Sequence, residues 1–363
     1  MRLRIERRED VSAAARVLAP IIAFAISLVI TAVIFVLSDV PPLVALHTYF
    51  VEPLSEVWSL HELAVKAAPL ILIAVGLSVC FRSSNWNIGA EGQFVVGAIA
   101  AASVPVLVPE ATGFWVMPLM FVLGAFGGAA WAAVPAVLKT RFGTNEILVS
   151  LMLVYVADQL LDWLVRGPWR NPEGFNFPET RGFGTDAILP EIVTMGEWGG
   201  RANWGIVVAL VFAVGTWLLL TRTLKGFEFD VTGASHRAAG FAGFDAKRTT
   251  LFAFLFSGAL AGLAGMIEVS GAIGQLRPSI SPGYGFTAII VAFLGRLHPL
   301  GIVVAGVLLA LTYLGGEAAQ ITLGLSERMA RVIQGILLCN VLIADALVHY
   351  RLRSVPDERM ATA

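Results

Sequence analysis

The sequence predicts an all-α fold, a polytopic membrane helical bundle of about ten transmembrane helices with broken or re-entrant segments and with both termini in the cytoplasm. Of the 363 residues, 57% are hydrophobic and only 14% are charged, and the mean hydropathy is +0.78; this composition is typical of membrane proteins. Predominantly apolar runs recur near the length of about 20 residues that crosses a bilayer core. The net charge of −1 predicts no nucleic acid partner.

The apolar runs are the predicted membrane spans. They occupy residues 17–38, 63–81, 91–108, 115–138, 146–165, 203–221, 250–270, 284–296, 299–317 and 328–348. The first run is longer than the apolar part of a signal peptide and has no small-residue cleavage site after it, so it predicts a retained anchor. The run at 284–296 is short and ends at Arg296, which predicts a half-helix or a re-entrant segment.

Basic residues are concentrated in the connections on one side of these spans, and this asymmetry predicts the orientation of the bundle. The outer loops at 39–60 and 109–114 contain no Lys or Arg. The basic residues predicted to be cytoplasmic are Arg2, Arg4, Arg7, Arg8, Arg82, Lys139, Arg141, Arg222, Lys225, Arg237, Lys247, Arg248, Arg351 and Arg353.

The same pattern divides the chain into regions. Residues 1–16 form a cytoplasmic N-terminal tail, residues 17–348 form the transmembrane domain, and residues 349–363 form a cytoplasmic C-terminal tail. The outer loop at 166–202 is rich in Gly, Pro, Asn and Trp, which predicts a compact folded cap. This cap is either a simple structured loop or a contact for an extracellular partner.

The segment SSNWNIGAEGQFVVGA at residues 83–98 interrupts two apolar runs with two Asn, one Glu, one Gln and three Gly. Polar groups inside a membrane domain are costly and mark a pathway by default. One interpretation is structural: Asn85 or Ser84 caps the following helix, and Glu91 lies near its start, where the dipole favours a negative charge. The other has Asn87, Glu91 and Gln93 facing a polar cavity that suits a neutral, hydrogen-bonding solute.

A second interruption, SISPGYGFTAIIVAFLGRLHPLG, occupies residues 279–301. Broken hydrophobic segments in matching halves of a transporter point to a substrate site between them. Thr144, Asn145 and Glu146 open the fifth span, where either helix capping or ligand contact explains them. The residues predicted to line a substrate pathway are Asn85, Asn87, Glu91, Gln93, Asn145 and Glu146.

Two acidic residues, Asp158 and Asp162, are four positions apart on one face of the fifth span. They are candidates for a proton relay in an ion-coupled carrier, or they mark a partly wet interfacial face. The five histidines are scattered through loops and span ends. No nucleophile–base or metal-binding set emerges from the sequence, so an intramembrane enzyme is the least favoured class and no metal or catalytic residue is predicted.

The cytoplasmic connection at 222–249 contains the small-residue sequence RAAGFAGF. Small residues permit close backbone approach, which suits a helix that docks into a partner's groove; a solvated connector is the alternative. The chain has no G-x-x-x-x-G-K-[ST] motif to hold nucleotide phosphates. Active transport would therefore need ATP hydrolysis by another subunit, or an ion gradient.

Four blocks resemble the permease subunits of bacterial ABC importers in the branched-chain amino acid, simple sugar and nucleoside group. In order they are NWNIGAEGQFVVGA, FGTNEILVSLMLVYVA, GASHRAAGFAGFDAKR and SPGYGFTAIIVAFLGRLHPLGIVVAG, and they extend from Asn85 to Gly306. The NIGAEGQ and GTNEI–LML combination is most similar to the nucleoside-type permeases. Val154 departs from the Asn-Tyr pair expected after LML in close nucleoside relatives, so the resemblance does not fix a purine nucleoside.

The resemblance implies a permease subunit of an ATP-driven importer for a small polar solute, nucleosides first, working by alternating access in the bacterial cytoplasmic (inner) membrane. Simple sugars, branched-chain amino acids and an ion-coupled mechanism are the alternatives. The implied partners are a second homologous permease, an ABC ATPase that hydrolyses ATP, an extracytoplasmic substrate-binding protein and the lipid bilayer; no cofactor is expected on this chain. The residues implied to couple to the ATPase are Arg237, Ala238, Ala239, Gly240, Phe241 and Gly243.

Overall fold

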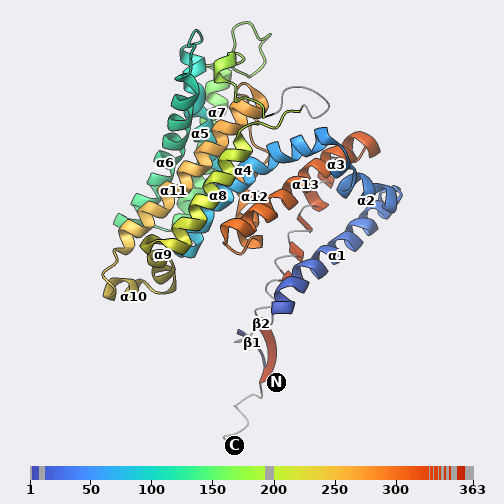
Figure 1. The fold of residues 1–363 in the computed structure, drawn as a ribbon, viewed down its shortest axis with the longest axis vertical. Coiled ribbons are helices and arrows are strands. Elements are labelled where there is room, and N and C mark those ends of the chain that lie inside the picture. Colours follow the sequence, from blue (N-terminus) through green and yellow to red (C-terminus); the bar gives the residue numbers. More distant parts are fainter. Residues whose placement is uncertain are drawn as a thin grey trace, which may run out of the picture. The chain divides into compact units, whose positions relative to one another are not determined.

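The computed structural model describes residues 2–7, 13–192, 200–326 and 350–355, together with parts of 328–344. The described chain is almost entirely helical (Figure 1), as predicted. It forms two compact units. We call residues 56–311 the main unit, and residues 1–55 with 312–363 the small unit.

The main unit contains the long helices of the bundle. Its elements are α4 (Val57–Arg82), α5 (Ala90–Leu107), α6 (Val116–Phe142), α7 (Glu146–Arg166), the 3-10 turn η1 (Thr185–Ala187), α8 (Gly205–Arg222), α9 (Leu224–Ala234), α10 (His236–Phe241), α11 (Ala246–Ile267), its π-helical extension η2 (Glu268–Ile273), α12 (Tyr284–Leu294) and the first part of α13 (Pro299–Leu323). Helix α11 packs against α4, α5 and α6, and α5 also packs against α6 (Figure 1).

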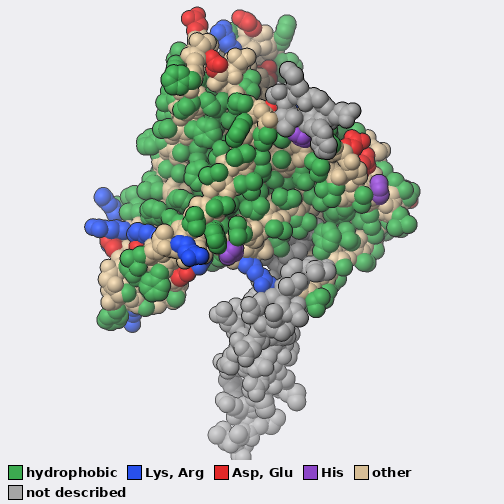
Figure 2. All heavy atoms as spheres, viewed as in Figure 1, with side chains coloured by type: hydrophobic (Ala, Val, Ile, Leu, Met, Phe, Trp, Pro, Cys, Tyr) green, Lys and Arg blue, Asp and Glu red, His purple; other side chains and the backbone are tan. Residues whose placement is uncertain are grey.

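Seven described helices are long and apolar enough to cross a membrane, namely α4, α5, α6, α7, α8, α11 with η2, and α13. They correspond to seven of the ten predicted spans. Figure 2 shows a broad hydrophobic surface over the main unit, with Lys and Arg side chains gathered near α9 and α10. This distribution agrees with a cytoplasmic position for α9 and α10.

The remaining predicted spans have different outcomes. Helix α12 has 11 residues, or about 16 Å at 1.5 Å per residue, so it is too short to cross a hydrocarbon core of about 30 Å by itself. The first span, 17–38, overlaps α1 (Ala13–Leu37) up to its last residue, and residues 22–37 of α1 form a shorter apolar helix. The span predicted at 328–348 lies largely outside the described residues.

Close backbone packing holds α11 against α6. A Cβ added to Gly128 would meet the carbonyl oxygen of Gly258 and the backbone of Gly262, and one added to Gly262 would meet the carbonyl oxygen of Gly124. Lipid tails provide little hydrophobic drive between membrane helices, so small residues at the contact allow the close packing that stabilises the pair. These glycines fix the spacing on which the position of α11 depends.

The small unit contains α1, α2 (Pro42–Phe50), α3 (Glu52–Ser55), the end of α13 and two strands. Strand β1 (Arg2–Arg7) pairs antiparallel with β2 (Tyr350–Val355), so the segments predicted as terminal tails also contain a short ribbon that the sequence reading missed. The hydrophobic cluster of the small unit consists of Phe35, Ala45, Tyr49, Ala319, Leu325 and Ile333.

The predicted cap at 166–202 is folded where it is described, and residues 193–199 lie outside the described residues. Its backbone pairs with the segment that follows α11: Thr180 N–H donates to the Leu276 carbonyl at 3.0 Å and Leu189 N–H to the Ser270 carbonyl at 2.9 Å. The cap therefore packs over η2 and the residues after it, as a compact loop.

Candidate functional site at the interrupted segments

The first interruption is a non-helical segment between α4 and α5. Helix α4 ends at Arg82, Ser84 has a left-handed φ of +54°, and α5 begins after Gly89. The prediction that Asn85 or Ser84 caps α5 is wrong, because several non-helical residues separate them from Ala90 and the N-cap position is Gly89, with no side-chain cap. Instead, Asn87 Oδ1 accepts from the Gly89 N–H at 3.2 Å.

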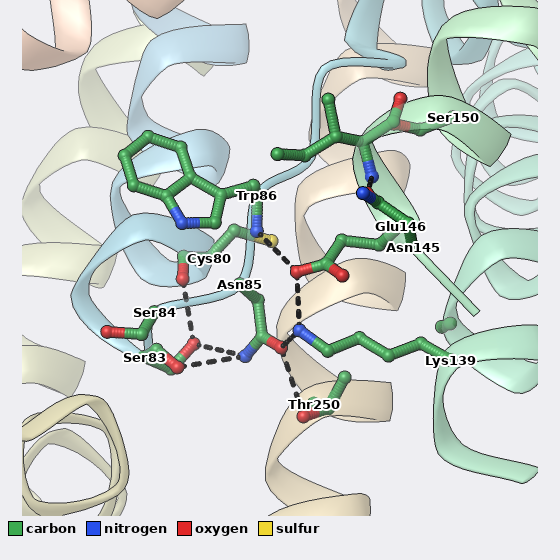
Figure 3. A network of polar contacts seen from close by, with 12 residues as sticks. Cys80, Ser83, Ser84, Asn85, Trp86, Lys139, Asn145, Glu146, Ser150 and Thr250 are labelled. Carbon is green, nitrogen blue, oxygen red and sulfur yellow. Dashed lines mark hydrogen bonds and ion pairs between the residues drawn. The ribbon is translucent and has the colours of Figure 1, made fainter. Parts of the chain in front are cut away.

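Asn85 is completely buried and organises a polar network (Figure 3). Its Oδ1 accepts from Lys139 Nζ at 2.8 Å and from Thr250 Oγ1 at 3.1 Å. Its Nδ2 donates to the carbonyl and the hydroxyl of Ser83, at 3.1 and 2.9 Å. One amide thus links the end of α4 to α6 and α11.

Lys139 extends this network to α7. Its Nζ forms an ion pair with Glu146 Oε1 at 2.5 Å, and the same oxygen accepts from the Trp86 N–H at 3.4 Å (Figure 3). Lys139 lies in the last turn of α6, on the side that the basic residues mark as cytoplasmic. Asn85 and Glu146 therefore lie together at the cytoplasmic end of the main unit, and their contact with a solute remains a prediction.

Asn87 and Gln93 form a reciprocal amide pair deeper along the segment. Asn87 Nδ2 donates to Gln93 Oε1 and Gln93 Nε2 donates to Asn87 Oδ1, each at 2.9 Å. Asn87 also donates to Ser257 Oγ on α11 at 3.1 Å. Their side chains are 0% and 1% exposed, so in this conformation each amide faces the other, and their role toward a solute stays a prediction.

Glu91 joins the two interruptions. It lies in the first turn of α5, as the structural interpretation predicts, and its Oε2 accepts from the Gly285 N–H at 2.5 Å. Gly285 belongs to the first turn of α12, so one carboxylate serves the N-terminal ends of two helices, where negative charge is favoured. The rings of Phe94 and Tyr284 meet edge to face at 6.1 Å.

The polar residues predicted on the fifth span lie at the start of α7 or within it, and they have separate roles. Asn145 caps α7, since its Oδ1 accepts from the Ile147 N–H at 2.9 Å, which confirms the capping interpretation. Asp162 forms an ion pair with Arg166 at 2.7 Å. Asp158 lies exposed on the surface of α7 in this single chain, and the relay predicted for the two aspartates remains untested.

The connection predicted to dock a partner folds as α9 and α10. Ser235 Oγ caps α10 by accepting from the Ala238 N–H at 3.3 Å. Of the residues predicted to couple to an ATPase, only Ala239 is buried; Arg237, Ala238, Gly240, Phe241 and Gly243 are exposed. Phe241 is 94% exposed.

Helix α9 is held by charged contacts that the sequence reading missed. Arg82 Nε and Nη2 donate to the two carboxylate oxygens of Asp230 at 2.8 and 2.7 Å. Glu228 pairs with Lys225 at 2.7 Å and accepts from Thr249 Oγ1 at 2.5 Å. Burial opposes ionisation of Glu228, but these hydrogen bonds outweigh it and lower the pKa of its carboxyl below the ordinary value.

The sequence carries one signal for these contacts. Arg82 and Lys139 were used only to predict orientation, yet each lies near the end of an apolar helix, beside a polar segment. A basic residue in that position can pair with nearby acids as well as face the cytoplasm. The partners Asp230 and Glu146 are 148 and 7 residues away, and no local pattern identifies the more distant one.

Comparisons with known proteins place these elements in a wider group. The family model for the permease component of branched-chain amino acid transport systems matches residues 59–342. The glucose ABC transporter permease protein TsgB13 of Haloferax volcanii is 33% identical over 98% of this chain and 95% of its own. The guanosine ABC transporter permease protein NupP of Bacillus subtilis is 28% identical over 91% and 94%, and the nucleoside ABC transporter permease protein NupB of Lactococcus lactis is 26% identical over 83% and 84%.

Proposed function

We propose a transport function from the premise that this chain belongs to the permease family of branched-chain amino acid transport systems. It is a multi-pass protein of the bacterial cytoplasmic membrane, as predicted, with several helices of spanning length. Its relatives are ABC transporter permease subunits, which are not enzymes themselves. Membership in this family implies an ATPase partner and a substrate-binding partner.

The specific proposal is a permease subunit of an importer for a small polar solute, with nucleosides as the first candidate and simple sugars as the second. A second homologous permease completes the pathway, an extracytoplasmic protein delivers the solute, and the partner ATPase hydrolyses ATP without a cofactor on this chain. The relatives named for guanosine, nucleosides and glucose support this choice, because nucleosides and glucose share a sugar ring that bears several hydroxyl groups. Amide and carboxylate side chains can recognise such groups by hydrogen bonding.

The observation that carries the proposal is the surface of α10. This short helix presents Gly240 and Ala238 to solvent next to a nearly fully exposed Phe241. A large aromatic side chain beside residues without bulk is the pattern of an anchor that enters a partner's pocket while the backbones come close. The basic residues nearby support a cytoplasmic position for this surface, the side on which an ATPase would bind.

The test is the substitution Gly240→Trp in the complete transporter. A side chain at Gly240 has open space within 4 Å, so the fold tolerates the indole while a docked partner does not. We expect recovery of the ATPase with the purified complex, and uptake of labelled guanosine, to fall by at least about tenfold, the effect of losing a central interface contact. Unlabelled glucose as a competitor then tests the choice between nucleoside and sugar.

Gly215→Trp is the matched control. Gly215 lies on the exposed face of α8, also with open space around an added Cβ, so this variant should insert, capture the ATPase and transport as the unmodified chain does. Normal ATPase capture and uptake by Gly240→Trp would contradict the docking role of α10. Uptake that persists when the ATPase is inactivated would instead favour the ion-coupled alternative.

A further inference from the structure

We propose that Arg82, Asn85, Lys139 and Glu146 form a transmission element that carries movement of α10 into the first interrupted segment. The inference rests on the proposed function, because it assumes that a partner moves α10. It assigns Asn85 and Glu146 to positioning of the helices, in place of the solute contacts that the sequence suggested.

The first step links α9 to the end of α4. The paired hydrogen bonds between the Arg82 guanidinium and the Asp230 carboxylate fix both distance and orientation. One turn later, Ser84 Oγ donates to the Gly233 carbonyl at 2.9 Å, and a Cβ on Gly233 would collide with the Arg82 carbonyl oxygen. Helix α9 is therefore joined to residues 82–84 by side chains and by direct backbone contact.

The second step explains why α9 moves as one piece with α10. Only Ser235 separates the two helices, and that residue caps α10. The Phe227 ring of α9 packs edge to face on Phe244, just after α10, with centroids 6.0 Å apart. A force applied to Phe241 thus reaches Asp230 and Gly233 through a packed unit.

The third step is the bend at residues 83–86. Here α4 ends, and Ser84 occupies the left-handed region at φ +54°. The backbone N–H groups of residues 83–85 still donate to carbonyls in the last turn of α4, and the side chain of Asn85 ties the segment to Lys139 and Thr250. Such a segment can shift when one contact is displaced, whereas the flanking helices resist deformation.

The fourth step connects the bend to the membrane interior. Lys139 bonds Asn85 and Glu146 together, and Glu146 also accepts from the Trp86 N–H (Figure 3). Directly after Trp86, the chain reaches Asn87, which pairs with Gln93, and then Glu91 in the first turn of α5, which accepts from the Gly285 N–H at the start of α12. A continuous series of contacts therefore leads from α10 to the N-terminal ends of α5 and α12.

The experiment uses Lys139→Met in the complete transporter and measures ATPase recovery, ATP hydrolysis and solute uptake separately. The Met side chain keeps the approximate length of Lys139 but removes the donor shared by Asn85 and Glu146. We expect ATPase recovery and hydrolysis within about twofold of the unmodified complex, with uptake reduced at least about tenfold, a coupling loss of the usual size for linked sites. Glu146→Gln should shift the ratio of uptake to hydrolysis in the same direction.

Arg141→Met is the matched control. Arg141 lies on the same helix end but is exposed, so its loss removes an equal charge without touching the network and should leave the ratio unchanged. Thr250→Val removes one hydrogen bond to Asn85 and replaces Lys139→Met as the deciding variant if the latter fails to insert. An unchanged ratio of uptake to hydrolysis in the deciding variant would overturn the inference.

The control complex distinguishes the two proposals. If the unmodified chain neither captures an ATPase nor supports ATP-dependent uptake, the proposed function fails and the transmission element fails with it. If the unmodified complex transports but the Lys139 variant loses hydrolysis and uptake in parallel, the network has a structural role only. That result overturns the transmission element and leaves the proposed function standing.

Discussion

The two interrupted segments meet through different groups. The first, at residues 83–98, contributes the carboxylate of Glu91. The second, at 279–301, contributes the backbone N–H of Gly285, which donates to Glu91 Oε2, and the side chain of Ser281, which also bonds Glu91. Each segment leaves polar groups that the other segment or a neighbouring helix satisfies, so broken helices can persist within a membrane domain.

The contacts of the first segment also differ in charge and exposure between its cytoplasmic end and its deeper part. At the cytoplasmic end, the contacts are ionic and partly exposed: Arg82 with Asp230, and Lys139 with Glu146. Further along, the Asn87–Gln93 pair is neutral and buried, and the buried Glu91 accepts from the Gly285 N–H. A buried charge is costly unless it is paired or hydrogen-bonded, whereas paired neutral amides satisfy each other without that penalty. The ion pairs therefore lie at the cytoplasmic end, and hydrogen bonds hold the deeper part of the segment.

The largest expected effect comes from Gly285→Val, which breaks the contact between the two segments. A Cβ at Gly285 would lie against the backbone N and Cα of Glu91, so α12 has to move away from α5. We expect a loss of about 1–3 kcal/mol or more in stability, the usual cost of overpacking, seen as a lower melting temperature of the detergent-solubilised protein. Gly215→Val is the control, and equal stability of the two variants would contradict the close approach.

A smaller effect should follow from Asn87→Leu, which leaves the buried Gln93 without its amide partner. An unsatisfied buried polar group costs about 1–3 kcal/mol. The double variant Asn87→Leu with Gln93→Leu should lose less stability than the sum of the two single variants, because it removes both partners of one pair. Thermal unfolding of the four proteins measures this coupling, and strict additivity would show that the pair is not a unit.

The smallest effect is expected from changing Asp158 and Asp162 together to Asn, because these carboxylates lie outside both interrupted segments. The Asp162–Arg166 ion pair is exposed, and such pairs contribute about 0–1 kcal/mol. A free-energy change in the middle of that range corresponds to a change of about two- to threefold, so ATP-driven uptake should stay within about threefold of the unmodified transporter. If the double variant takes up no solute at any ATP concentration, and uptake by the unmodified chain depends on an ion gradient, the result would favour an ion-coupled carrier.

Much of the fold could be predicted because a membrane helix is recognisable from the hydrophobicity of its own contiguous residues. Spans such as 63–81 and 146–165 follow from hydrophobic length, and their orientation follows from residues such as Arg82 and Lys139. The capping role of Asn145 was also accessible, because it depends on a residue only two positions away. The cap predicted for Asn85 was wrong, because the length of the extended stretch before α5 depends on packing against α6 and α11.

The sequence by itself determined the membrane class, the orientation, the two interruptions and the small residues of α10, since each depends on composition or on neighbours along the chain. Only the tertiary structure decided that Glu91 meets Gly285, 194 residues away, that Arg82 meets Asp230, and that Lys139 bridges Asn85 and Glu146. The physical reason is that a polar group in a membrane domain must find a partner, but which partner it finds depends on how closely the helices approach. Glycines such as Gly128 and Gly262 set that approach in three dimensions.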